Sequence, residues 1–124
     1  PLLIVTGKTT ATGLLAGGAH IAFRGEAQFD DAIFANYNHG ELIFEGPVSA
    51  GLLYNSDHML DMRHPNREKN IGVYFNDMEN DVVDDDAYDE EENLPAAVQA
   101  VVLPELKSSD DIYEHLSRGN RVLK

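Results

Sequence analysis

The stretch "ANYNHGELIFEGPVSAGLLYNSDHML", residues 35–60, contains the repeating pattern that decides the fold. Leu42 and Phe44 alternate with other residues, as expected for a strand with one buried face. Gly46 follows, and after another short alternating run comes the apolar pair Leu52-Leu53. The stretch therefore predicts a strand, a glycine corner, a short strand, an apolar pair and a polar corner, in a unit of about 19 residues.

The same unit occurs four times. Its corner positions are Gly7, Gly25, Gly46 and, in the last copy, His64. The residues four before these corners are Leu3, Ile21, Leu42 and Leu60, and the apolar pairs are Leu14-Leu15, Ile33-Phe34, Leu52-Leu53 and Val73-Tyr74. One unit cannot bury its apolar face alone, whereas stacked units can. We expect Leu15, Phe34 and Leu53, which are nineteen residues apart, to stack in one column.

These repeats predict a mainly β protein, a short single-stranded β-solenoid with rungs of about 19 residues and a C-terminal helical cap; the family resemblance given below implies the right-handed β-helix type. We expect solenoid rungs over residues 1–76, an acidic segment over 77–93 and the cap over 94–124, all in one structural domain. The alternative is a β-sandwich or small barrel, whose hairpins often contain Asn-Gly or Asp-Gly. The chain contains neither dipeptide.

Charge is concentrated in one segment. The 124-residue chain has a formal net charge of −13, and residues 77–92 hold ten acidic residues and no basic one. Such a block favours a solvated linker, with a docking surface for a basic partner and calcium binding as alternatives. The acidic patch comprises Asp84, Asp85, Asp86, Asp89, Glu90, Glu91 and Glu92. Glu26, Asp30, Asp31, Glu41 and Glu45 are expected on a solvated face.

The C-terminal part contains a clear helix signal. In "SSDDIYEHLSRGN", Ser108 or Ser109 is a candidate N-cap, and Gly119 is a candidate end. We expect this helix to close an open end of the solenoid, with Val122 and Leu123 as a last apolar anchor. The preceding run "VQAVVL" fits either a helix that Asn93 could cap or a strand along a sheet edge.

Three histidines share the nineteen-residue spacing. His20, His39 and His58 would stack in one column, and the next step reaches Asp77. Three imidazoles and a carboxylate can bind zinc or iron, although ligands in one line converge poorly on a tetrahedral centre. The alternative is a corner ladder in which imidazoles bond to neighbouring asparagines. The candidate contact surface comprises Asn36, Tyr37, Asn38, Tyr54 and Asn55.

Several segments resemble known proteins. These are Tyr37-Asn38-His39-Gly40, Leu42, Phe44, Gly46, Leu52-Leu53, Asp57-His58 and the tail 116–123. With them the chain resembles right-handed β-helix proteins of the polymer-forming, bactofilin-like type and a group of uncharacterised bacterial β-solenoid proteins. The resemblance implies a short solenoid, and bactofilins polymerise end to end. The long acidic segment and the helical tail depart from that pattern.

The function predicted is therefore a structural or protein–protein interaction module without catalysis or cofactor. We expect a protein partner or self-association, and no nucleic acid, because acidic chains repel phosphate. No apolar run approaches the ~20 residues of a membrane span, and the absence of cysteine suits a cytoplasmic location. The alternatives are an acidic inhibitor or immunity-type protein that neutralises a basic partner, and a metal-binding protein or enzyme that uses the histidines.

Overall fold

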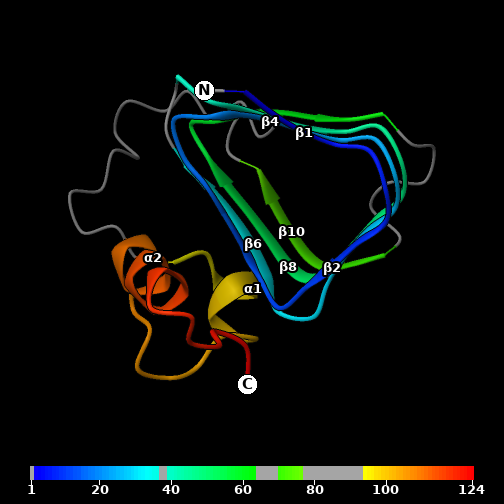
Figure 1. The fold of residues 1–124 in the computed structure, drawn as a ribbon. Coiled ribbons are helices and arrows are strands. Elements are labelled where there is room, and N and C mark those ends of the chain that lie inside the picture. The colour runs from blue at the N-terminus through cyan, green and yellow to red at the C-terminus, as the bar shows by residue number, and fades with distance from the viewer. Residues whose placement is uncertain (1, 37–38, 64–69, 77–93) are drawn as a thin grey trace.

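The chain winds into a three-sided coil of parallel strands, seen along its axis in Figure 1. The computed structural model describes residues 2–36, 39–63, 70–76 and 94–124. Sheet 1 contains β1 (Leu2–Val5), β4 (His20–Phe23), β7 (Glu41–Phe44) and β9 (Met59–Met62). Sheet 2 contains β2 (Thr9–Ala11), β5 (Ala27–Phe29) and the start of β8 (Val48–Ser56). Sheet 3 contains β3 (Leu14–Ala16), β6 (Ala32–Asn36), the rest of β8 and β10 (Ile71–Asn76).

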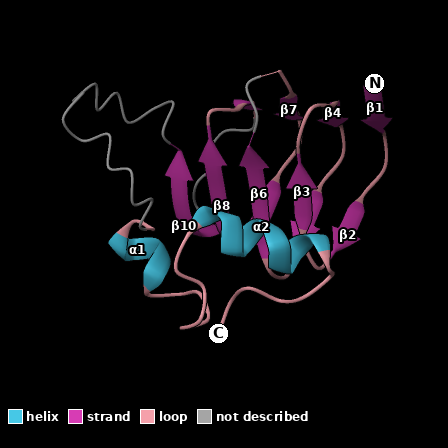
Figure 2. Cartoon of the chain, turned by 90° about the vertical axis from the view of Figure 1, so that its left-hand side faces the viewer, coloured by secondary structure: helices cyan, strands magenta, loops and turns pink. Residues whose placement is uncertain are grey.

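The predicted right-handed β-helix is confirmed. In Figure 1 the chain runs clockwise from β1 to β2, and Figure 2 shows that successive rungs follow one another along the axis. The glycine-anchored alignment is also correct: Leu3 pairs with Ile21, Ile21 with Leu42, and Leu42 with Leu60. The rungs are not uniform, because these three steps span 18, 21 and 18 residues.

One predicted column is wrong. Leu15 does pair with Phe34, but Phe34 pairs with Tyr54, and Leu53 pairs with Ile33. A shift of one residue moves a strand side chain to the opposite face. Leu53 therefore belongs to the core inside the coil, whereas Phe34 lies on the outer face of sheet 3.

Residues 94–124, here called the C-terminal unit, cover that outer face. They contain α1 (Ala96–Gln99) and α2 (Ser109–Ser117), which lie across sheet 3 in Figure 2. Under them Phe34, Tyr54 and Phe75 form an aromatic column, with ring centroids 5.3 and 4.9 Å apart. Buried residues of the unit complete this second core: Leu94, Val98, Val102, Leu106, Ile112 and Val122.

The predicted helix exists, but the expectation that it closes an open end of the solenoid is wrong. An apolar outer column on sheet 3 gives the unit a larger dry surface than a rung end does, so it packs on the side of the coil. The ambiguous run "VQAVVL" contains the end of α1 and then Val102, which forms a single antiparallel bridge with Leu123. Asn93 lies outside the described residues, and α1 has no side-chain cap.

Asp31 holds the tail of the C-terminal unit against the coil. Its side chain accepts hydrogen bonds from the backbone N–H groups of Val122 and Leu123, both at 2.9 Å. The residue is 0% exposed. The expectation of a solvated position for Asp31 is therefore wrong, because residues 91 and 92 positions later cover it.

The N-cap of α2 gives a first prediction. The Ser108 hydroxyl accepts from the Asp111 backbone N–H, and the Asp111 carboxylate accepts from the Ser108 N–H, which forms a capping box. We expect Ser108→Ala to lower the free energy of unfolding by about 1 kcal/mol in urea titrations. Ser109→Ala, one position later and without this role, serves as the control. Equal effects of both substitutions would contradict the assignment of Ser108 as the cap.

Candidate functional site

The first rung, residues 2–18, presents an uncovered edge. Among the described residues, β1, β2 and β3 each pair with a strand on one side alone. We call their other side the first-rung edge. Figure 2 shows β1 and β2 lying beyond the end of α2, whereas α2 passes over β3 and contacts it.

Three consecutive apolar residues on β1 are exposed at this edge. Leu2, Leu3 and Ile4 are 70%, 53% and 44% exposed. Of their partners one rung later, Ile21, which pairs with Leu3, is 9% exposed, whereas His20, which pairs with Leu2, is exposed. Exposed apolar patches on a sheet edge are typical of protein contact surfaces.

The first rung also differs in charge from the rest of the chain. Residues 1–25 contain Lys8 and Arg24 and no acidic residue, and the first carboxylate is that of Glu26. The remaining 99 residues therefore carry all 22 acidic side chains. The first-rung edge is an apolar, carboxylate-free surface on an acidic protein.

The three histidines do not form the predicted column. His20 pairs with Glu41, and Glu41 with Met59, so the sheet 1 register places His39 two positions and His58 one position away from that column. The reason is the 21-residue second rung. Among residues 2–36, 39–63, 70–76 and 94–124, no group of three His, Cys, Asp or Glu side chains could hold a metal. Asp77 lies outside them.

Each histidine has its own setting. His20 is exposed and lies 3.5 Å from the Glu41 carboxylate. His39 is exposed in the turn before β7. His58 is 1% exposed. The Asn55 amide donates to the backbone carbonyl of His58 at 3.0 Å. The ladder of imidazoles bonded to asparagines stays a prediction.

Two of the five residues of the predicted contact surface are buried. Tyr54 is 8% exposed within the aromatic column, and Asn55 is 0% exposed inside the coil. Asn55 donates to the side-chain oxygen of Asn76 at 2.8 Å, so these two asparagines join successive rungs. Asn36 is exposed, as expected. The prediction is wrong for Tyr54 because the C-terminal unit covers it. It is wrong for Asn55 because this side chain faces the inside of the coil.

Other predicted positions lie outside the described residues. These are Tyr37, Asn38, His64 and the acidic patch Asp84, Asp85, Asp86, Asp89, Glu90, Glu91 and Glu92. Across the part of the chain that is described, none of the helices has the length and apolar character needed to cross a membrane.

The outer face of sheet 1 carries a row of ion pairs. Glu45 lies between Arg24, at 3.3 Å, and Arg63, at 3.2 Å. Arg63 also donates to Asp61 at 2.9 Å, and this hydrogen bond raises the pKa of the Arg63 guanidinium. These side chains are solvated, so the pairs contribute little to stability.

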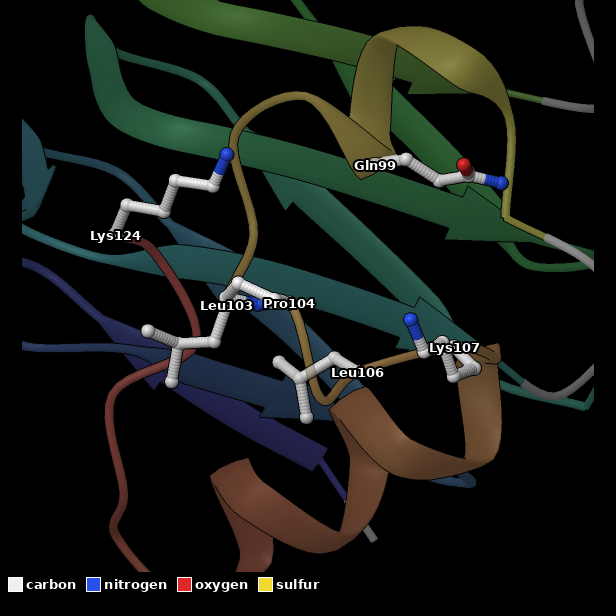
Figure 3. Close-up of a pocket in the computed structure, with 6 residues that line it drawn as sticks. All are labelled: Gln99, Leu103, Pro104, Leu106, Lys107 and Lys124. Carbon is white, nitrogen blue, oxygen red and sulfur yellow. The ribbon is translucent and has the colours of Figure 1, made fainter.

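A pocket of about 460 Å³ lies within the C-terminal unit (Figure 3). Leu103, Pro104 and Leu106 form its apolar wall, and Lys107 and Lys124 flank it. The Lys124 ammonium group donates to the carbonyl of Ala100 at 3.1 Å, so this lysine holds the tail against α1. Lys107 and Lys124 are the titratable side chains among the described residues that line this pocket.

Comparisons with known proteins give no family. No protein-family model matches the chain, and neither the curated proteins nor the solved structures yield a match. Sequence reasoning missed the exposed residues Leu2, Leu3 and Ile4. The signal that could have drawn attention to them is the run of three consecutive apolar residues at positions 2–4.

Proposed function

We propose that this protein is a structural or protein–protein interaction module whose contact surface is the first-rung edge. The observation that carries the proposal is the exposure of Leu2, Leu3 and Ile4 beside unpaired strand edges. A strand edge supplies backbone N–H and C=O groups in a row, and the apolar side chains supply area to bury. Both a protein partner and self-association use this surface in the same way.

The finer assignments belong to this proposal as well. The bactofilin-like resemblance supports assembly through solenoid ends, and the cysteine-free composition supports a cytoplasmic location. The acidic-inhibitor and metal alternatives stay predictions, since no arrangement of the described residues favours them over the edge.

The sheet 1 register provides a matched pair of variants for the test. Leu2, His20, Glu41 and Met59 occupy one outward column, with Leu2 in the first rung and Met59 in the last. Leu2 is 70% exposed and Met59 is 56% exposed. We expect Leu2→Glu to remove the assemblies that the wild-type chain forms, because a carboxylate must be desolvated at the contact. Met59→Glu is expected to leave these assemblies intact.

The measurement is light scattering after size-exclusion chromatography of the purified chain, combined with chemical cross-linking in the source cells and mass spectrometry. Both variants are first shown to have the wild-type unfolding midpoint in urea. The proposal is wrong if every assembly, with itself or with another protein, survives Leu2→Glu. It is also wrong if Met59→Glu disrupts the same assemblies equally.

A further inference from the structure

The pocket in the C-terminal unit, with a volume of about 460 Å³, has walls held in place by backbone hydrogen bonds. The N–H of Leu103 donates to the carbonyl of Val122 at 2.8 Å, and that of Lys124 donates to the carbonyl of Val101 at 3.0 Å. The N–H of Leu106 then closes a turn on the carbonyl of Leu103 at 3.0 Å. Pockets of roughly 300–1,000 Å³ are typical of small-molecule sites. This pocket therefore combines a suitable volume with a wall that the main chain fixes.

Lys107 and Lys124 lie on opposite sides of the apolar wall in Figure 3. The backbone of Lys107 is fixed at the start of α2, because its N–H donates to the Asp111 carboxylate at 2.7 Å. Its ammonium group has no ion-pair partner among the described residues. The Lys124 ammonium group donates to the carbonyl of Ala100 at 3.1 Å, and an ammonium group carries further N–H donors. Both lysines can therefore donate to a ligand that enters the pocket.

The lining of the pocket carries no negative charge among the described residues. Its other members, Gln99, Leu103, Pro104 and Leu106, are uncharged. The C-terminal unit has four acidic and four basic residues and is neutral, although the whole chain has a net charge of −13. Two ammonium groups without a carboxylate beside them in the lining attract an anion and repel a cation. Charge complementarity therefore selects a negatively charged ligand.

We propose that this pocket binds a small organic anion in which a carboxylate is attached to an apolar body. Leu103 and Pro104 supply apolar surface for the body, and Lys107 and Lys124 donate charge-assisted hydrogen bonds to the carboxylate. The amide nitrogen of Gln99 already donates to a backbone carbonyl at 2.6 Å, so the two lysines remain the principal donors for the ligand. The inference goes beyond the proposed function, because the site lies in the C-terminal unit and not at the first-rung edge.

Titration of the purified chain with sodium hexanoate, followed by amide chemical shifts, tests the inference. Hexanoate is expected to shift the signals of residues 99–107 and 124 in a saturable way, with a dissociation constant of about 1 mM. Lys107→Gln is expected to raise this constant about fivefold or more, because one of the two ammonium groups is lost. Lys8→Gln is the matched control, because it removes the same charge from an exposed lysine in the first rung. It should leave the dissociation constant unchanged, and both variants should keep the wild-type unfolding midpoint in urea.

Two further probes define the class of ligand. Hexanol lacks the charge and inorganic phosphate lacks the apolar body, so each is expected to bind at least about tenfold more weakly than hexanoate. Equal binding of hexanol would overturn the role of the lysines, and equal binding of phosphate would overturn the role of the apolar wall. Equal effects of Lys8→Gln and Lys107→Gln, or no saturable shift up to about 50 mM hexanoate, would overturn the site itself. The test of the first-rung edge is independent of all these outcomes.

Discussion

Replacing Asp31 with alanine is expected to lower the free energy of unfolding by about 3–5 kcal/mol. The carboxylate accepts hydrogen bonds from the backbone N–H groups of Val122 and Leu123; Asp31 and Val122 are buried, and Leu123 is partly buried. Removing the acceptor leaves two donors without a partner, and a buried donor left in this way costs about 1–3 kcal/mol. The change is large against the total stability of a domain of this size, which is roughly 5–15 kcal/mol.

Urea titration gives the size of the effect, and amide hydrogen exchange locates it. The N–H groups of Val122 and Leu123 should lose their protection first, followed by those of α2. Asp30→Ala is the matched control, because Asp30 is the exposed neighbour in the sequence. An Asp31→Ala variant with wild-type protection at residues 122 and 123 would show that another group holds the tail.

Gly40→Ala, which adds a methyl group at position 40, is expected to lower the free energy of unfolding by about 3 kcal/mol or more. A Cβ atom on Gly40 would collide with the carbonyl oxygen of Gly17 and come within 3.1 Å of that of Ala19. It would also meet the imidazole of His58, which is buried and has little room to move. The backbone of the preceding rung cannot move away from the new methyl group without breaking the register of sheet 1.

The control for this substitution lies in the same corner. Gly17→Ala adds the same methyl group where nothing lies within 4 Å, and we expect a change below about 0.5 kcal/mol. The comparison is made by thermal or urea unfolding at low protein concentration, where assembly does not contribute. Equal stabilities of Gly40→Ala and Gly17→Ala would mean that the rungs are not stacked as described.

The winding of the chain could be predicted because glycine corners and alternating residues repeat within each rung. Leu3, Ile21 and Leu42 were aligned correctly by counting back from a glycine. The position of Leu53 was predicted wrongly, because the rungs differ in length from 18 to 21 residues and have their additional residues at different corners. A fixed period of nineteen then shifts one strand by one residue, which exchanges its inner and outer faces.

The candidate site was less predictable from sequence. Asp31 looks like any surface carboxylate until residues 122 and 123 are placed on it, and nothing local in the chain encodes that contact. Tyr54 and Asn55 looked like corner residues, but the same one-residue shift and the C-terminal unit bury them. The three histidines are evenly spaced in the sequence, but the structure does not place them in one column. The register of sheet 1 is set by backbone pairing and not by residue type.

The bond between Asp31 and the tail also affects how the molecule comes apart. In a simple solenoid each turn touches its neighbours alone, so turns at one end can fray while the others persist. Here residues 122 and 123 are hydrogen-bonded to Asp31 in the second turn of the coil. The helices of the C-terminal unit pack on sheet 3, to which the other turns also contribute strands. Unfolding of the later turns therefore also requires release of the tail from Asp31 and from the second core, so we expect these turns and the C-terminal unit to unfold together.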